Sequence, residues 1–174
     1  MAVGFHPLTV VDIERDTPSS VLVTFGGGDA ELPFEHGQYL TFRREIDGVE
    51  IRRSYSICSP ADGALRVGIK RVDGGAFSTW ATSALRVGDA VEAMAPMGRF
   101  THELDPTTAR TYTLVAGGSG ITPIYSIAAT ILAAEPESVV TLLQVDQTTS
   151  SIMLLDDVED LRNLHLDRFR VWRQ

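Results

Sequence analysis

Cysteine is almost missing from this sequence, and its scarcity excludes several kinds of site. Cys58 is the only cysteine among the 174 residues, so they can form no internal disulfide, four-cysteine zinc site or cysteine-ligated iron-sulfur cluster. The four histidines, His6, His36, His102 and His165, are spread along the chain without the spacing of metal ligands. We therefore expect structural or surface histidines and no metal site.

Positive charge and long apolar runs are scarce as well. The chain has 15 Lys and Arg against 23 Asp and Glu, a formal net charge of -8, which argues against nonspecific binding to nucleic acid or to an anionic membrane. No apolar stretch approaches the roughly 20 residues that span a bilayer, and the first residues do not resemble a secretion signal. We expect a cytoplasmic protein in which any anionic ligand binds at a local basic site.

Residues 5–96 have the pattern of short strands separated by Gly and Asp turns. Strands are expected at 8–14, 21–25, 39–44, 50–58, 65–71 and 90–95. One helix is expected at 76–85, where apolar residues recur at three- and four-residue spacing. Six short strands predict a closed barrel or a sandwich.

After residue 105 the pattern changes to alternating strands and helices. We expect strands at 111–117, 139–145 and 168–172, and helices between them at 123–134 and 152–161. The apolar run 111–117 is typical of a strand buried on both faces. This βαβαβ order predicts a parallel α/β unit. The polar stretch 102–110 separates it from the first module, so we expect two domains, residues 1–103 and 111–174.

The second domain has fewer strands than the five or six that are usual for an open parallel sheet. We therefore expect an incomplete domain with an exposed sheet edge and an uncovered apolar face. Such a surface favours self-association, exchange of segments with another copy or partial disorder, unless a partner chain completes the sheet.

Three segments carry candidate binding chemistry. Arg53-Ser54-Tyr55-Ser56 lies in a predicted strand, where a guanidinium could bind a pyrophosphate and a tyrosine ring could stack on a flavin. Taken alone, such residues more often form a packed ring and solvated hydroxyls.

The second segment, Gly74-Gly75, precedes the helix expected at 76–85, and Lys70 and Arg71 lie just before it. A helix start presents free N–H groups to an anion, although a turn closed by a serine is an equal alternative.

The third segment is LVAGGSGITP, residues 114–123, in which Gly117, Gly118 and Gly120 lie between a predicted strand and the helix that follows. Such a loop delivers backbone amides to the pyrophosphate of a dinucleotide. The alternative is a tight turn between strand and helix without a ligand.

The order of these motifs resembles a known family. R-S-Y-S, G-I-K-R-V-D-G-G-A-F-S and P-M-G-R-F follow one another within about fifty residues. This stretch resembles the FAD domain of the ferredoxin-NADP reductase family, and most closely the reductase component of phenylacetyl-CoA epoxidase and related ring-oxygenase reductases. Gly37-Gln38-Tyr39 resembles the P-G-Q-Y turn of that family, with His36 in place of Pro, and A-G-G-S-G-I-T-P resembles its nicotinamide-dinucleotide signature.

The resemblance implies a two-domain fold, an antiparallel six-stranded β-barrel with one helix that binds FAD, followed by an incomplete parallel α/β domain that binds NADP or NAD. It implies that Arg53 binds the FAD pyrophosphate, that Tyr55 lies against the flavin ring and that Ser56 lies near flavin N5. The implied cofactor-binding residues are Arg53, Tyr55, Ser56, Ile69, Lys70, Gly75, Phe77 and Ser78 for FAD and Gly118, Gly120, Ile121, Thr122 and Pro123 for the nicotinamide dinucleotide. Tyr55, Ser56 and Thr122 are the implied catalytic residues.

By the same resemblance, hydride passes from NAD(P)H to FAD and electrons then pass to an iron-sulfur protein or an oxygenase component. One alternative is a flavin-binding or interaction module without productive NAD(P)H oxidation, and another is a structural barrel that binds no flavin.

The sequence also departs from the family pattern. Asp146-Gln147-Thr148 stands where relatives have Asn-Arg-Thr, so a partner for a 2′-phosphate is missing and an acceptor for a 2′-hydroxyl is present. NADH is therefore compatible with this strand end. The C-G-P motif and the ferredoxin domain of the resembled reductases do not occur in these residues, so we expect a fragment or a truncated form.

Overall fold

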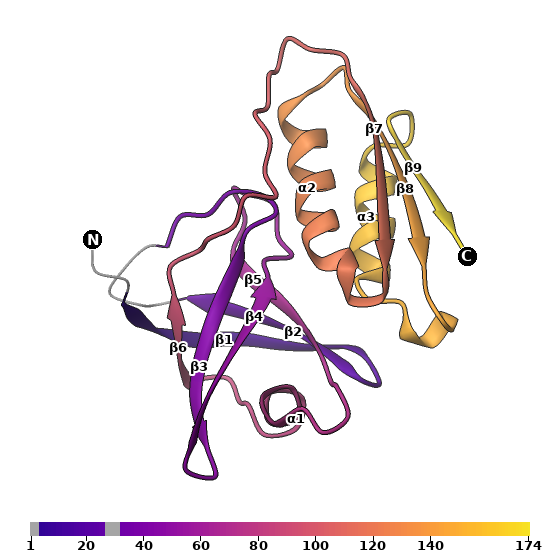
Figure 1. Ribbon diagram of the computed structural model, residues 1–174. Helices are drawn as coiled ribbons and strands as arrows, with labels where there is room; N and C mark the ends of the chain where they lie inside the picture. Colours follow the sequence, from indigo (N-terminus) through magenta and orange to yellow (C-terminus); the bar gives the residue numbers. More distant parts are fainter. Residues whose placement is uncertain (1–3, 27–31) are drawn as a thin grey trace.

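The computed structural model describes residues 4–26 and 32–174, which form two sheets (Figure 1). The first is a six-stranded antiparallel sheet with strand order β4-β3-β6-β1-β2-β5. Its elements are β1 (Phe5–Thr17), β2 (Ser20–Gly26), β3 (Tyr39–Ile46), β4 (Val49–Ser56), β5 (Leu65–Lys70) and β6 (Ala90–Met94), with α1 (Ala76–Ser83) between β5 and β6. We call these elements the barrel.

The two edge strands of this sheet meet and close it. A bridge pairs Ile57, directly after β4, with Val67 on β5, and the Cys58 N–H donates to the Arg66 carbonyl at 2.8 Å. Alternate residues of the strands point inward because side chains change face at every step of a strand. Large members of the resulting core are Phe42, Ile69 and Phe77, all at most 2% exposed. The antiparallel six-stranded barrel with one helix is confirmed.

The second sheet has the parallel order β7-β8-β9. Its elements are β7 (Thr111–Gly117), the 3-10 turn η1 (Gly118–Gly120), α2 (Ile121–Ala134), β8 (Val139–Val145), the 3-10 turn η2 (Thr149–Ser151), α3 (Leu155–Leu164) and β9 (Phe169–Arg173). We call them the α/β lobe. The predicted parallel α/β arrangement is confirmed. In the described part of the chain, neither helix nor any other has the length and apolar composition that crossing a membrane requires.

The last helix begins three residues later than the periodicity predicts, at Leu155. Thr148 and Ser151 bond to each other's backbone N–H groups around η2, and this local pairing competes with an earlier helix start.

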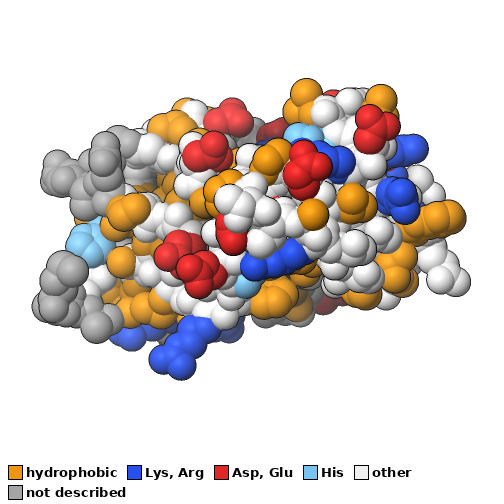
Figure 2. Space-filling view, turned by 90° about the horizontal axis from the view of Figure 1, so that it is seen from above, with side chains coloured by type: hydrophobic (Ala, Val, Ile, Leu, Met, Phe, Trp, Pro, Cys, Tyr) orange, Lys and Arg blue, Asp and Glu red, His pale blue; other side chains and the backbone are white. Residues whose placement is uncertain are grey.

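The prediction that residues 111–117 are buried on both faces is wrong. Tyr112, Leu114 and Ala116 face the helices, whereas Val115 is 63% exposed. The cause is that α2 and α3 both lie on one side of the sheet (Figure 1). Across the opposite face, Val115 pairs in register with Leu143 and Leu143 with Trp172, and no described element covers this row. Figure 2 shows hydrophobic side chains at this right-hand end of the molecule.

The barrel and the α/β lobe pack against each other. Leu22 and Cys58 of the barrel are buried in the same hydrophobic cluster as Met153 and residues of α2 and α3. The Asp16 carboxylate accepts a hydrogen bond from the Leu154 N–H at 2.9 Å. These contacts place the end of β4 and the middle of β5 beside the start of α2.

Candidate functional site

A pocket of about 590 Å³ lies between the barrel and the α/β lobe, within the usual size range of ligand sites. We call it the central pocket. It is lined by Ser54, Tyr55, Ser56, Gly68, Lys70, Arg71, Val72, Ser119, Gly120, Thr122 and Pro123. The end of β4 and the second half of β5 form one wall, and η1 with the start of α2 forms the other.

Tyr55 contributes an aromatic wall to the central pocket. Its pairing with Leu40 across β3 and β4 fixes the direction of the side chain, and its ring lies 5.7 Å from that of Phe77 and 6.1 Å from that of Phe42. Burial raises the pKa of Tyr55 to about 12, against the opposing charge of Arg53. The residue therefore presents a neutral, packed ring near neutral pH.

Gly68 controls how closely the two walls approach. A Cβ atom at this position would lie 2.7 Å from Thr122 Cγ2 and 3.0 Å from Met153 Cε. Thr122 is itself buried, and its hydroxyl donates to the Ser119 carbonyl at 2.9 Å. The bare backbone of β5 thus lets the start of α2 approach the barrel.

The turn before α1 is closed by a serine. Ser78 Oγ accepts from the Val72 N–H at 3.1 Å and donates to the Gly75 carbonyl at 3.2 Å. Gly74 has a φ of +73°, a conformation that favours glycine. The Ser78 hydroxyl is therefore committed to the turn, while α1 begins without a side-chain cap.

The structure brings six of the predicted residues to the central pocket and separates seven from it. Those that line it are Tyr55, Ser56, Lys70, Gly120, Thr122 and Pro123. Those that do not are Arg53, Ile69, Gly75, Phe77, Ser78, Gly118 and Ile121. Ile69, Phe77 and Ile121 are core residues, at most 2% exposed, because each points to the apolar side of its own strand or helix.

Sequence reasoning gave no binding role to four residues of the central pocket: Ser54, Gly68, Val72 and Ser119. It noted Arg71 only as positive charge before the turn, without assigning it to a cofactor. Gly68 carried a usable signal, because a glycine inside a strand pattern often marks the close approach of another segment.

The residues around the central pocket fit a flat ring joined to a diphosphate. Lys70 and Arg71 place positive charge at the wall formed by β5, in a chain of net charge -8. Arg53 is exposed on β4, two residues before Tyr55, and among the described residues its guanidinium donates a hydrogen bond only to the Arg52 carbonyl. Its guanidinium is thus available for an anion, while Tyr55 offers a ring face.

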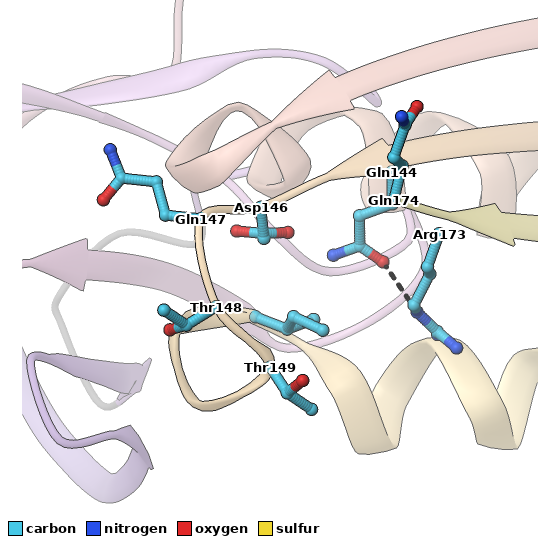
Figure 3. A pocket seen from close by; sticks show the side chains of 8 residues that line it. Gln144, Asp146, Gln147, Thr148, Thr149, Arg173 and Gln174 are labelled. Carbon is cyan, nitrogen blue, oxygen red and sulfur yellow. Dashed lines mark hydrogen bonds between the residues drawn. The ribbon is translucent and has the colours of Figure 1, made fainter.

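A second pocket, of about 320 Å³, lies at the carboxyl ends of β8 and β9 (Figure 3). We call it the β8 pocket. Its lining residues are Gln144, Asp146, Gln147, Thr148, Thr149, Ile152, Arg173 and Gln174. Because parallel strands end at the same edge of a sheet, this pocket and the glycine turn η1 after β7 share one edge of the α/β lobe.

Comparison with known proteins agrees with this geometry. Residues 8–102 match the family described as the oxidoreductase FAD-binding domain, and residues 114–174 match the oxidoreductase NAD-binding domain. A component of the 1,2-phenylacetyl-CoA epoxidase from Escherichia coli is 37% identical over 96% of this chain and 48% of its own length. The ferredoxin reductase component of 3-ketosteroid-9-alpha-monooxygenase from Mycobacterium tuberculosis is 36% identical over 93% of this chain and 47% of its own length. The chain spans about half the length of these curated relatives.

Solved structures show the same architecture. The cytochrome P450 reductase GcoB from Amycolatopsis superposes with a TM-score of 0.84 at 30% identity, over 98% of this chain and 51% of the other. The ferredoxin-NADP+ reductase from Plasmodium falciparum superposes with a TM-score of 0.85 over 98% of this chain and 73% of the other, and at 16% identity it supports the fold alone. The chain therefore belongs to the FAD-binding oxidoreductases of the ferredoxin reductase family, with a barrel of the FAD-binding type followed by sequence of the NAD-binding type.

Proposed function

We propose that this chain is part of an FAD-containing, NAD(P)H-dependent electron-transfer reductase. The observation that carries the proposal is the composition of the central pocket: Tyr55 and Ser56 from the barrel face Gly120, Thr122 and Pro123 from the α/β lobe. Since the two walls match an FAD-binding and an NAD-binding family, a flavin ring and a nicotinamide ring would meet between them. The proposed division of labour assigns FAD to residues 1–103 and the dinucleotide to residues 111–174.

Several residues of the barrel are proposed to hold FAD. Tyr55 would support the flavin ring, with Phe77 packed behind it, and Ser56 would lie at its edge. Arg53 and Lys70 would bind the diphosphate, with the backbone around Ile69 and the turn of Gly75 and Ser78 as supports. In this assignment the core residues Ile69 and Phe77 would position the groups that contact FAD.

The α/β lobe is proposed to bring the dinucleotide to the flavin. The turn at Gly118 and Gly120 would bind its pyrophosphate, the buried Ile121 anchors the start of α2, and Thr122 with Pro123 would face the nicotinamide. Bound FAD would accept a hydride from NADH or NADPH and release electrons singly. The protein's own contribution is to align the two rings and to exclude water between them.

The electron acceptor is proposed to be an iron-sulfur protein or an oxygenase component. The two curated relatives described above are named as parts of an epoxidase and of a monooxygenase. We further propose that a second copy of the chain covers the bare face of β7, β8 and β9, where Val115, Leu143 and Trp172 form one exposed row. Analytical ultracentrifugation tests this, and a compact monomer at high concentration would contradict it.

A visible spectrum of the purified chain with added FAD tests the proposed function. An anaerobic titration of the same sample with NADH and NADPH should bleach the flavin peaks. Peaks that persist would leave a flavin-binding module, and the absence of bound flavin would refute the assignment of the barrel.

Two variants of Tyr55 separate its ring from its hydroxyl. Tyr55→Ala should weaken FAD binding by about tenfold, since stacking on an aromatic ring contributes roughly 1–3 kcal/mol. Tyr55→Phe should keep most of the wild-type affinity, because it keeps the aromatic ring that the proposal places against the flavin.

A further inference from the structure

Two histidines meet where the barrel joins the α/β lobe. His36 lies in the turn 35–38 that leads into β3, and His102 lies in the connecting stretch, residues 95–110, between β6 and β7. His36 Nε2 lies 3.2 Å from the His102 backbone nitrogen and 3.3 Å from His102 Nδ1. The His36 side chain is buried, and we call this contact the histidine pair.

The hydrogen bonds of the histidine pair require a neutral His36. A backbone N–H can only donate, so His36 Nε2 accepts from the His102 N–H, and the single proton of the neutral His36 ring is on Nδ1. His102 Nδ1 faces the same lone pair and therefore carries a proton itself. In a neutral His102 the other ring nitrogen, Nε2, is then a bare acceptor, and it is buried without a partner among the described residues.

A proton on His36 Nε2 would turn the shared acceptor into a donor. Three N–H groups would then point at one another, and both donors of His102 would lose their acceptor, which is unfavourable for buried groups. The surroundings already disfavour the charged ring. Burial lowers the pKa of His36, the neighbouring His102 lowers it further, and the charge of Glu35 opposes both effects.

The other charged and titratable groups around the histidine pair in the described chain are exposed or engaged with one another. They are Arg99 and Glu103 on the connecting stretch, Tyr112 on β7, and Arg110 and Glu135 beyond it. Arg99 and Glu103 are exposed to water and salt, which screen their charges, while Glu135 binds both Arg110 and Tyr112. The helix α2 has no acidic or basic residue over 121–134.

The histidine pair holds a joint that reaches both walls of the central pocket. Gly37, beside His36, has a φ of +77°, and a Cβ there would overlap the Phe100 carbonyl oxygen and lie 3.3 Å from Ile127 Cδ1 of α2. The turn is thus packed tightly between the connecting stretch and α2. The strand β3 that follows it pairs with the part of β4 that carries Tyr55, and α2 carries Thr122 of the opposite wall.

We propose that the histidine pair is a pH-sensitive latch between the barrel and the α/β lobe, closed while His36 is neutral and released when His36 Nε2 takes up a proton. Release frees the turn from the connecting stretch and lets α2 move away from it, which widens the central pocket. A histidine whose pKa is lowered on folding stabilises the latched form above the ordinary value of 6.5, and this contribution is lost as the pH falls below it. The latch acts whichever ligand the central pocket binds, so it stands or falls separately from the proposed function.

NMR spectroscopy of the full chain from about pH 8 to about pH 5, where histidine titrates, tests the latch. The His36 Cε1–H shift follows protonation, and a nuclear Overhauser cross-peak between Gly37 Hα and the Ile127 δ-methyl group follows the contact of the turn with α2. This cross-peak should be lost together with the titration of His36, below pH 6.5. Protection of the His102 N–H against hydrogen exchange should fall about tenfold or more over the same range, the size expected when a buried donor loses its acceptor.

His36→Gln separates the hydrogen bond from the titration. The Gln Oε1 can accept from the His102 N–H but takes up no proton in this range, so this variant should keep the cross-peak and the exchange protection at every pH. His6→Gln is the matched control, because it removes a histidine of β1 outside the histidine pair, and it should respond to pH as wild type does.

A wild-type cross-peak that survives the titration of His36 would overturn the proposal, as would a His36 ring that stays neutral down to about pH 5. Loss of the cross-peak in His36→Gln at the same pH as in wild type would equally refute it, because another group would then be responsible. If His36→Gln does not fold, wild type alone decides: the midpoint of His36 protonation and the midpoint for loss of the Ile127 contact must coincide, and separate midpoints would contradict the latch.

Discussion

At the scale of single residues, Gly68 marks the tightest contact between the two walls of the central pocket. In Gly68→Ala the new Cβ would lie 2.7 Å from Thr122 Cγ2, so α2 must move away from β5. We expect a loss of about 1–3 kcal/mol in the free energy of unfolding, the usual cost of overpacking, measured by urea denaturation. Gly117→Ala is the control, because its Cβ would have only an ordinary contact of 3.9 Å with the Val145 carbonyl. Equal effects of the two variants would contradict the steric explanation.

Glu135, at the end of α2, is a fully buried carboxylate. Burial raises its pKa, but hydrogen bonds from Ser138, the Asp105 N–H and Tyr112, together with the charge of Arg110, outweigh this and hold the pKa below the ordinary value of 4.5. A lowered folded-state pKa stabilises the fold above the unfolded value, and the contribution is lost as the pH falls through the folded value.

Glu135→Gln should therefore lower the free energy of unfolding by about 1–3 kcal/mol near neutral pH. The difference from wild type should shrink as the pH falls below 4.5. Denaturant curves across this range measure it, with the exposed neighbour Glu137→Gln as control. A difference that stays constant with pH would show that the charge of Glu135 contributes nothing.

At the scale of elements, α1 depends on the turn that precedes it. Ser78→Ala leaves the Val72 N–H without its acceptor, which should cost about 1–3 kcal/mol of stability. Because this turn is proposed to lie over the FAD diphosphate, FAD affinity measured by fluorescence titration should fall as well. Ser83→Ala removes an exposed hydroxyl of the same helix, whose one hydrogen bond to the described residues goes to the Thr79 carbonyl. That variant should change neither quantity appreciably.

The elements themselves could be predicted because their signals are local. The alternation around Arg53-Ser54-Tyr55-Ser56 placed Tyr55 and Ser56 in a strand expected at 50–58, which ends at Ser56 in the structure, and the glycines before Pro123 marked the start of a helix. Burial of β7 could not be predicted in the same way. An apolar run such as 111–117 does not show whether one face or both are covered, since this depends on where α2 and α3 pack.

Contacts between the barrel and the α/β lobe were also beyond prediction from sequence. Asp16 and the Leu154 N–H are 138 positions apart, and no periodic pattern links residues at that separation. Likewise, the resemblance assigned Ser78 and Ile69 to the cofactor, but it could not show that the hydroxyl of Ser78 is used within its own turn or that the side chain of Ile69 lies in the core.

At the scale of the whole molecule, one ion pair among residues 4–26 and 32–174 joins the barrel to the α/β lobe. Arg66 on β5 binds both oxygens of Asp157 on α3, and the two side chains are 19% and 20% exposed. A double-mutant cycle with Arg66→Ala and Asp157→Ala should give a coupling of about 1 kcal/mol or more, since partial burial reduces screening. The control cycle on Arg52 and Glu50, which are 56% and 47% exposed, should give close to zero. Equal coupling energies would mean that the Arg66–Asp157 pair stabilises the molecule no more than an exposed surface pair does.

The buried thiol of Cys58 makes it possible to measure how often the contact between the lobes opens. Its thiol is fully enclosed, and burial raises its pKa to about 12, so alkylating reagents can react only when the molecule opens, because the thiolate is the reactive form. Since Cys58 belongs to the barrel but packs among residues of α2 and α3, its labelling rate reports how often the two lobes part. Asp157→Ala should accelerate labelling under native conditions by more than its loss of global stability explains. The alkylation rate of Cys58 is thus a built-in measure of lobe separation.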